Sequence, residues 1–437
     1  MSSKLVTASG ARPRNLQPAV LKQRARECVL FLLGIAGCVV LGVCRLLRPI
    51  VRIEIDHLRA ARIGQLFTVT TYQLRKRTLR RAIDAEEGVK RRELSLRIVH
   101  PGSMANGYAV DMIARREIVM KSRLAFLMLG ATRRLRPHSP VWPEGDTFGL
   151  EDYETWEKTK PNLISFTPDE TARGNALLRE MGLPEGAPYI CFAVRDPAYL
   201  NVAYRPEEQN PPQPANFWSY QDYRDASLES YRPMAEWFAS RGYWVLRMGA
   251  VVEQPLDWSN PRIIDYASNF RSEFGDIYLL TNCRFFIGDT AGITMVPYAA
   301  GVPFALGNYL PLERQVPGAD CLIIPKKFRR PGESEFLSFR EAYELGALKS
   351  NFQHMFVEAG IEPVANSAEE ILAMAQELKG RKEGAWRDSD EDRALQRRFW
   401  DIWPADHRIS AIPYDIAERH YCRIATSFLR LNRRLLD

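Results

Sequence analysis

The sequence predicts an α/β protein of two domains, in which strands and helices alternate along the chain. Three observations lead to this fold class. The chain has 437 residues, 46% of them hydrophobic and 26% charged, which is enough for two hydrophobic cores. Short apolar runs alternate with amphipathic stretches that begin at helix-capping residues. Polar residues directly follow several of the apolar runs, as they do where parallel strands end at one edge of a sheet.

The N-terminal part of the chain is expected to meet a membrane. Residues 1–27 are polar and basic and are expected to be a disordered tail. Residues 28–50 are expected to be a membrane-associated apolar segment, because Cys28 to Cys44 form an uncharged run of 17 residues, near the length that crosses a bilayer. Basic residues flank both ends of the run, so their distribution does not orient it. A single membrane span and a shallow membrane-dipping segment both fit this pattern.

The first domain is expected over residues 51–184. Val51 to Ile55 and Leu94 to Val99 have strand patterns, and each leads into a helical stretch. The last helix of this domain starts with a capping box and stops at Gly182 and Pro184, two residues typical of helix ends. The boundary is therefore expected after residue 184.

The second domain is expected over residues 185–380 and has the clearer strands. Tyr189 to Val194, Tyr243 to Met248 and Phe285 to Ile287 are apolar runs separated by capped helices. Repeated strand–helix units with wholly apolar strands predict a doubly wound parallel sheet. Residues 381–437 are expected to form C-terminal helices that pack back on the first domain.

Cysteine and charge usage exclude several classes of protein. The seven cysteines are scattered without a CxxC pair, which indicates neither a disulfide framework nor a zinc site and is typical of a reducing compartment. Asp388-Ser389-Asp390 lies in an acidic run with no strand before it, so we expect no metal there, and no cofactor elsewhere. Much of the net charge of +7 lies in the first 100 residues. No nucleic-acid-binding module is recognisable, so we expect a membrane and not a nucleic acid as partner.

Polar residues gather where the strands of the second domain end. Arg195 and Asp196 follow the first strand, Arg247 lies at the end of the second, and Asn308 follows a later one. The carboxyl ends of parallel strands meet at one edge, so this cluster predicts a ligand site there. For each arginine alone the alternative is an ordinary ion pair with a nearby aspartate.

The segment Gly288-Asp289-Thr290-Ala291-Gly292 belongs to the same edge, directly after an apolar strand. Gly288 permits a sharp turn and Gly292 admits a close ligand. Thr290 can cap the next helix, which leaves backbone N–H groups for an anion. The segment is neither a Walker loop nor GxGxxG. The alternative is that Asp289 or Thr290 merely caps a helix.

Taken together, these segments resemble a bacterial family of glycosyltransferases. The resemblance is carried by FFIGDTAGI with GVPFALGN, by YRDASLESY with RGYWVLRMG, and by ICFAVRD and RIGQL. More distantly, DTAG followed by AAGVP is similar to a pattern of heptosyltransferases, which have the GT-B fold of two facing Rossmann-like domains. The chain departs from the family at Gln65, where His is common, and at Asp225, where Asn is common.

The resemblance implies an enzyme that moves a hexosyl or similar group from a nucleotide-sugar donor to a glycan or glycolipid acceptor, without a metal, in surface polysaccharide biosynthesis. It implies these donor-binding residues in the second domain: Arg195, Arg224, Arg247, Gly288, Thr290, Ala291, Gly292 and Asn308. It implies that the first domain presents the acceptor over Arg62, Gly64 and Asn106. The candidate bases for the acceptor hydroxyl are Asp196, Asp225 and Asp289.

Several alternatives stay open at this point. Arg224 and Asp225 stand before a helix, where capping and charge balance are common reasons for such residues, and Asn106 also fits a helix cap. A nucleotide-sugar epimerase with the GT-B fold and a non-catalytic membrane-bound scaffold both fit the same sequence. Cysteine usage and the cytosolic location of nucleotide sugars favour a catalytic domain on the cytoplasmic side of a bacterial membrane.

Overall fold

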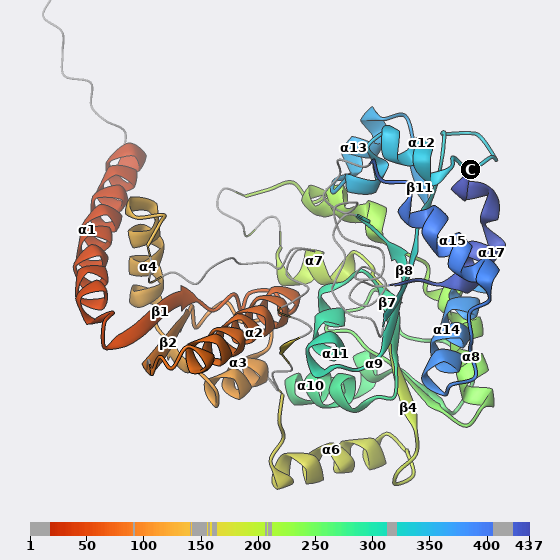
Figure 1. Ribbon diagram of the computed structural model, residues 1–437, viewed down its shortest axis with the longest axis horizontal. Coiled ribbons are helices and arrows are strands. Elements are labelled where there is room, and N and C mark those ends of the chain that lie inside the picture. The colour runs from red at the N-terminus through yellow and green to blue at the C-terminus, as the bar shows by residue number, and fades with distance from the viewer. Residues whose placement is uncertain are drawn as a thin grey trace, which may run out of the picture. The chain divides into compact units, whose positions relative to one another are not determined.

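The computed structural model (Figure 1) describes residues 18–90, 92–139, 141, 155, 158–159, 164–205, 208, 212–312, 321–404 and 423–437. The chain forms two compact units. The first comprises Met1–Leu58, Arg91–Gly102 and Ile118–Pro143, and the second comprises Arg59–Lys90, Ser103–Glu117 and Glu144–Asp437. The predicted first domain, 51–184, therefore falls partly in each unit. Its predicted boundaries, and its role in acceptor binding, stay predictions.

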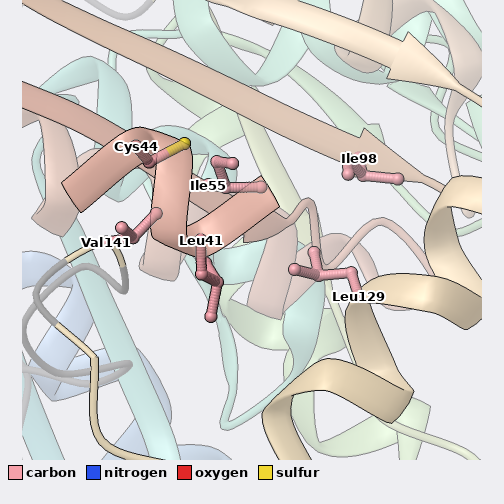
Figure 2. Close-up of a cluster of buried hydrophobic side chains, with 6 residues drawn as sticks. All are labelled: Leu41, Cys44, Ile55, Ile98, Leu129 and Val141. Atoms are coloured by element: carbon pink, nitrogen blue, oxygen red, sulfur yellow. The ribbon is translucent and has the colours of Figure 1, made fainter. Parts of the chain in front are cut away.

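The first unit has a parallel sheet of three strands, in the order β1 (Val51–His57), β2 (Arg92–Val99) and β3 (Ile118–Lys121). The strands predicted from 51–55 and 94–99 are thereby confirmed. The long helix α1 (Pro18–Leu47) packs along α4 (Arg123–Leu135), as Figure 1 shows. A small apolar core joins both helices to the sheet (Figure 2) and consists of Leu41, Cys44, Ile55, Ile98, Leu129 and Val141.

The second unit is built on a sheet of seven strands whose order is β12-β9-β8-β7-β4-β5-β6. The strands are β4 (Tyr189–Ala193), β5 (Trp244–Arg247), β6 (Ile263–Ile264), β7 (Phe286–Asp289), β8 (Phe304–Tyr309), β9 (Cys321–Pro325) and β12 (Arg423–Ile424). All neighbouring strands run parallel. The chain proceeds from β4 through β5 to β6 on one side, and then from β7 outward on the other. The predicted doubly wound parallel sheet is confirmed.

Helices cover both faces of this sheet. In Figure 1, α10 and α11 lie on one side of β7 and β8, and α8 and α14 lie on the other. The longer helices of this unit are α2 (Ile63–Glu86), α3 (Gly107–Ala114), α6 (Pro168–Glu180), α8 (Arg232–Ser240), α10 (Glu273–Asn282), α14 (Ala368–Lys382) and α15 (Asp390–Trp400). Helix α2 packs on α11 (Met295–Ala300), and α3 packs on α10. These contacts explain why 59–90 and 103–117 belong to the second unit.

Shorter elements complete the second unit. They are α7 (Ala198–Ala203), α9 (Tyr266–Asn269), α12 (Phe339–Glu344), α13 (Gln353–Glu358), α17 (Thr426–Leu431), the 3-10 helices η3 (Phe217–Arg224), η4 (Leu228–Tyr231), η5 (Gly292–Thr294), η6 (Ala347–Lys349) and η7 (Arg433–Leu436), and the antiparallel pair β10 (Lys327–Arg329) and β11 (Glu362–Val364).

The described part of the C-terminal segment packs on the second sheet. Helix α17 contacts α14 and α15, and β12 pairs with β9. Residues 405–422 lie outside the described part of the chain, so the expected packing of 381–437 on the first domain stays a prediction. Cys321 in β9 is disulfide-bonded, whereas Cys28, Cys38, Cys44, Cys191 and Cys283 are free. One disulfide is not a framework, but it weakens the inference of a reducing compartment.

Candidate functional site

The order of the strands reverses beside β4, because β5 lies on one side of it and β7 on the other. Open α/β sheets bind ligands at such a switch point, outside the carboxyl ends of the strands. A cavity of about 120 Å³ lies at this position. Its walls include 193–196 at the end of β4, 248–252 after β5 and 291–293 after β7. The predicted ligand edge therefore holds a cavity at the point that the topology favours.

The walls of this cavity are mainly apolar, with a few charged groups. Arg195 and Asp196 line it, as expected from the strand ends. Arg271 and Asp276 also line it, and the arginine donates to the carboxylate from Nη2 at 3.0 Å and from Nε at 3.2 Å. The Tyr266 hydroxyl donates to the other carboxylate oxygen at 3.1 Å. Burial raises the pKa of Asp276 to about 6, against the opposing charge of Arg271.

Asp289, at the end of β7, is a buried acceptor with three donors. The Tyr231 hydroxyl and Asn308 Nδ2, the latter at 2.8 Å, donate to Oδ1. The backbone N–H of Arg195 donates to Oδ2 at 3.1 Å. Burial raises the pKa of Asp289, and these bonds oppose the rise. The carboxylate therefore ties β7 to β4, β8 and η4, which gives it a positioning role inside the fold.

Asn308 and Arg247 are likewise engaged within the protein. Asn308 has a left-handed backbone with φ 51°. Its backbone N–H donates to Asn366 Oδ1 at 2.6 Å, and its own Oδ1 accepts the backbone N–H of Asn366 at 2.8 Å. Arg247 is buried, donates to the Gln254 carbonyl at 2.5 Å and pairs with Asp265 at 3.5 Å. Both residues stabilise loops behind the cavity wall, and neither lines the cavity.

The glycines of the site lie in close contact with neighbouring backbone. A Cβ at Gly64 would lie 2.8 Å from Cα of Gly292, and a Cβ at Gly292 would lie 3.2 Å from the backbone N of Gly64. The two glycines thus allow α2 to begin directly against η5. A Cβ at Gly288 would lie 2.5 Å from the Ala193 carbonyl, so this glycine permits the close pairing of β4 with β7. Gly292 also lines the cavity, and the expected approach of a ligand to it stays a prediction.

Arg195 forms a cluster of three cations with Arg224 and Lys326. Arg195 forms an ion pair with Asp225, in which Arg195 Nε lies 3.1 Å from Asp225 Oδ1. Neither of these two atoms forms a hydrogen bond. Arg224 donates from Nη2 to the Thr290 carbonyl, and Lys326 Nζ donates to the Asp225 carbonyl at 2.9 Å. Lys326 is only 3% exposed. Burial lowers the pKa of Arg224 to about 10 and also lowers that of Lys326, and the charge of Arg195 adds to both effects.

Two donors in this cluster have no partner. Among the residues described, Arg224 Nε and Thr290 Oγ1 are buried without a hydrogen bond. Buried polar atoms are almost always paired, so these two unpaired donors beside three cations indicate a place where an oxyanion fits. Thr290 does not cap the following helix with its side chain, and Thr294 instead donates to the Asp289 carbonyl at 3.2 Å.

The three candidate bases are thereby ranked. Asp289 is saturated with donors. Asp196 accepts the backbone N–H of Ala198 at 2.9 Å and that of Glu253 at 3.1 Å, so it orients α7 and the loop after β5. Asp225 keeps Oδ1 free of hydrogen bonds, and burial raises its pKa to about 6 although Arg195 opposes the rise. Of the three, Asp225 is the best placed to accept a proton near neutral pH.

Of the expected acceptor residues, Asn106 is buried as a helix cap and Arg62 is exposed. Asn106 accepts the N–H of Ala109 at 2.8 Å and donates to the Glu273 carbonyl at 2.9 Å, so it caps α3 and ties it to α10. The alternative of a helix cap is therefore correct for its side chain. Arg62 is exposed, and its guanidinium carbon lies 5.3 Å from the ring centre of Tyr204.

Sequence reasoning missed three residues of the site. Lys326 directly follows β9, so the same strand-end rule that found Arg195 would have found it. Arg271 and Asp276 lie before and within α10, where no pattern distinguishes them from ordinary surface charges. No group of three or more His, Cys, Asp or Glu that could hold a metal occurs within the described ranges.

Comparisons with known proteins identify no family for the chain. No family model and no curated protein matches the sequence. Among solved structures it is similar to a glycosyl transferase family 9 protein from Veillonella parvula, with 11% identity over 75% of this chain and 98% of that chain and a TM-score of 0.41. It is also similar to the E. coli ADP-heptose LPS heptosyltransferase II (11% identity, 70% and 97% covered, TM-score 0.31) and to the E. coli heptosyltransferase WaaC (12% identity, 64% and 94% covered, TM-score 0.29). All three TM-scores are below 0.5, so we infer no function from these similarities.

Proposed function

We propose that this chain is a glycosyltransferase that uses a nucleotide-sugar donor. One observation carries the proposal: at the switch point of a doubly wound sheet, Arg195, Arg224 and Lys326 converge beside two unpaired donors, Arg224 Nε and Thr290 Oγ1. A nucleoside diphosphate supplies both the negative charge and the acceptor oxygens that this cluster lacks. The mainly apolar cavity next to Arg195 suits the nucleoside part.

The chemistry follows from these positions. In sugar transfer, the acceptor oxygen bonds to the anomeric carbon while the bond from that carbon to the diphosphate oxygen breaks. Positive charge develops on the sugar and negative charge on the departing diphosphate, which Arg195, Arg224 and Lys326 stabilise. Asp225 accepts the proton of the acceptor hydroxyl. When the diphosphate draws Arg195 to itself, the ion pair between Arg195 and Asp225 weakens, and the carboxylate is released to act as the base.

The proposal also covers the need for a metal, the acceptor and the position at a membrane. The three cations supply the charge that a metal ion supplies in other transferases, so we infer that transfer needs no metal. The acceptor is a glycan or glycolipid of surface polysaccharide biosynthesis, approaching near the exposed Arg62 at the start of α2. The apolar α1 holds the enzyme at the membrane, with the catalytic unit on the cytoplasmic side.

Calorimetric titration with nucleoside diphosphates, followed by activity assays with a panel of nucleotide sugars, tests the proposal. We expect micromolar to millimolar binding that weakens about tenfold or more in Arg195→Gln and Arg224→Gln. Arg232→Gln is the matched control, because Arg232 lies on the exposed face of α8 and pairs only with Glu229 and Glu236 among the contacts found for it. No binding by the unmodified protein, or equal loss in the control, would contradict the assignment.

The same assay separates the alternatives. An epimerised nucleotide sugar that forms without any acceptor would indicate an epimerase. If Arg195→Ala and Arg224→Ala leave the cellular phenotype intact, a non-catalytic scaffold is indicated.

A further inference from the structure

Helix α1 is long and apolar enough to cross a membrane over Val20–Leu47, and an 18-residue window within it has a mean hydropathy of 2.5. Length and composition alone do not distinguish a helix that crosses the bilayer from one that lies within a single leaflet. The contacts that α1 makes inside the first unit do distinguish them, and they do not depend on the proposed sugar transfer.

One side of α1 is covered by α4, which lies alongside it in Figure 1. The buried positions Gly34, Gly37, Leu41 and Cys44 recur every three or four residues, so they lie on one side of the helix. A Cβ at Gly34 would lie 2.7 Å from Leu135 Cδ1, and one at Gly37 would lie 1.8 Å from Thr132 Oγ1. Small residues thus bring the two helices into direct contact. The rest of the α1 surface exposes apolar side chains, including Val29, Phe31, Leu32, Ile35, Val39, Val40 and Val43.

The C-terminal end of α4 places two arginines beside the middle of α1. Leu135, which contacts Gly34, is flanked by Arg134 and Arg136, and both arginines are exposed. The centre of the uncharged run 28–44 is residue 36, only about 3 Å along the helix axis from Gly34. The guanidinium groups are therefore attached level with the centre of the apolar run.

A second charged group lies on the sheet side of α4. Arg133 pairs with Asp56 at 2.8 Å, and Arg97 lies 3.7 Å from the same carboxylate. Asp56 belongs to β1, whose core residue Ile55 packs with Leu41 of α1 (Figure 2). If α1 crossed the bilayer with this packing intact, an ion-pair network and part of a sheet would enter the hydrocarbon. Charges and open sheet edges are both strongly unfavourable there.

We propose that α1 is a monotopic anchor: it lies in one leaflet of an anionic membrane, and α4 covers its polar-facing side. Helix α1 alone is apolar on all sides between 28 and 44, but the pair is amphipathic, because α1 supplies the lipid-facing surface and α4 supplies arginines. The exposed Leu124 and Leu127 continue the apolar surface onto α4. The exposed basic residues at the borders of this surface match anionic headgroups, and they are Arg45, Arg48, Arg123, Arg134 and Arg136.

Thiol labelling of the full-length protein in right-side-out and inverted bacterial membrane vesicles tests this topology. Cys28 is exposed at one end of the apolar run, and Ile50→Cys in a Cys28→Ala background places an exposed thiol just beyond the other end. Cys38→Ala and Cys44→Ala remove the thiols in between. A membrane-impermeant maleimide is expected to reach both positions from the same face. Labelling from opposite faces, or a protein that does not sediment with the vesicles, would overturn the proposal.

A pair of glycine variants tests the role of α4. Gly37→Leu forces a side chain into Thr132, whereas Gly42→Leu adds the same apolar group where no atom lies within 4 Å. We expect Gly37→Leu to separate the helices and to give a fraction of molecules labelled from opposite faces. Gly42→Leu is expected to keep the labelling of the unmodified protein. Equal behaviour of the two variants would show that α4 does not determine the topology.

Discussion

Replacing Asp225 by Asn should stabilise the protein while removing its activity. Burial raises the pKa of Asp225 from its ordinary 3.8 to about 6, so the charged carboxylate lowers the free energy of unfolding. A shift of about two units corresponds to about 3 kcal/mol between the two protonation states. The charge of Arg195 is already part of this shift, and because the side chain is 23% exposed, solvent screening reduces the gain to roughly 1–2 kcal/mol.

The stability gained by Asp225→Asn depends on pH. Because the pKa of Asp225 is higher in the folded state, its favourable contribution is complete below about pH 4 and disappears as the pH rises through about 6. Asp225→Asn should therefore be more stable than the unmodified protein at pH 8 and nearly equal to it at pH 4. Its transfer rate should fall by about 10²–10⁴, as expected when a general base is removed.

Urea unfolding at pH 4, 6 and 8, combined with a transferase assay, measures both effects. Asp257→Asn is the control, because Asp257 is exposed and lies outside the cluster of Arg195, Arg224 and Lys326. A variant that is less stable at pH 8 would show that the ion pair with Arg195 outweighs burial. Full activity of Asp225→Asn would refute the assignment of the base.

Three further predictions follow from the same site. The plot of kcat/KM against pH should fall on the acid side near pH 6, since Asp225 must be ionised, and a rate that stays level down to pH 5 would exclude this role. Asp289→Ala should lower the free energy of unfolding by about 3–6 kcal/mol, as it leaves three buried donors unpaired, and a loss below about 1 kcal/mol in urea unfolding would contradict the structure. Lys326→Gln should weaken nucleoside diphosphate binding about tenfold in calorimetry with little loss of folding, whereas Lys327→Gln, which removes a cation paired with Glu370, should leave the affinity unchanged.

The sheet of the second unit was predictable because its strands are buried on both faces. A strand such as Tyr189–Ala193 then contains apolar residues only, and that pattern is visible without any tertiary information. The edge that holds the cavity follows from the same rule, and Arg195 lines that cavity. Arg247 also ends a strand but does not line the cavity, because its side chain bonds to Asp265 and to the Gln254 carbonyl in the loop after β5.

Other features depend on contacts that a linear pattern does not contain. A glycine signals that something approaches the backbone, but the sequence does not say what approaches, and at Gly292 it is Gly64. The same holds for Gly34 and Gly37, whose contacts with α4 decide how the apolar segment can meet a membrane. Asn106 was recognisable as a helix cap, and the structure adds its bond to Glu273.

A structure of the protein with a bound nucleotide sugar would locate the diphosphate directly. We expect diphosphate oxygens within about 3.2 Å of Arg224 Nε and Thr290 Oγ1, with Arg195 turned from Asp225 toward the diphosphate. A diphosphate bound away from the carboxyl ends of β4 and β7, with the ion pair of Arg195 and Asp225 unchanged, would contradict this expectation.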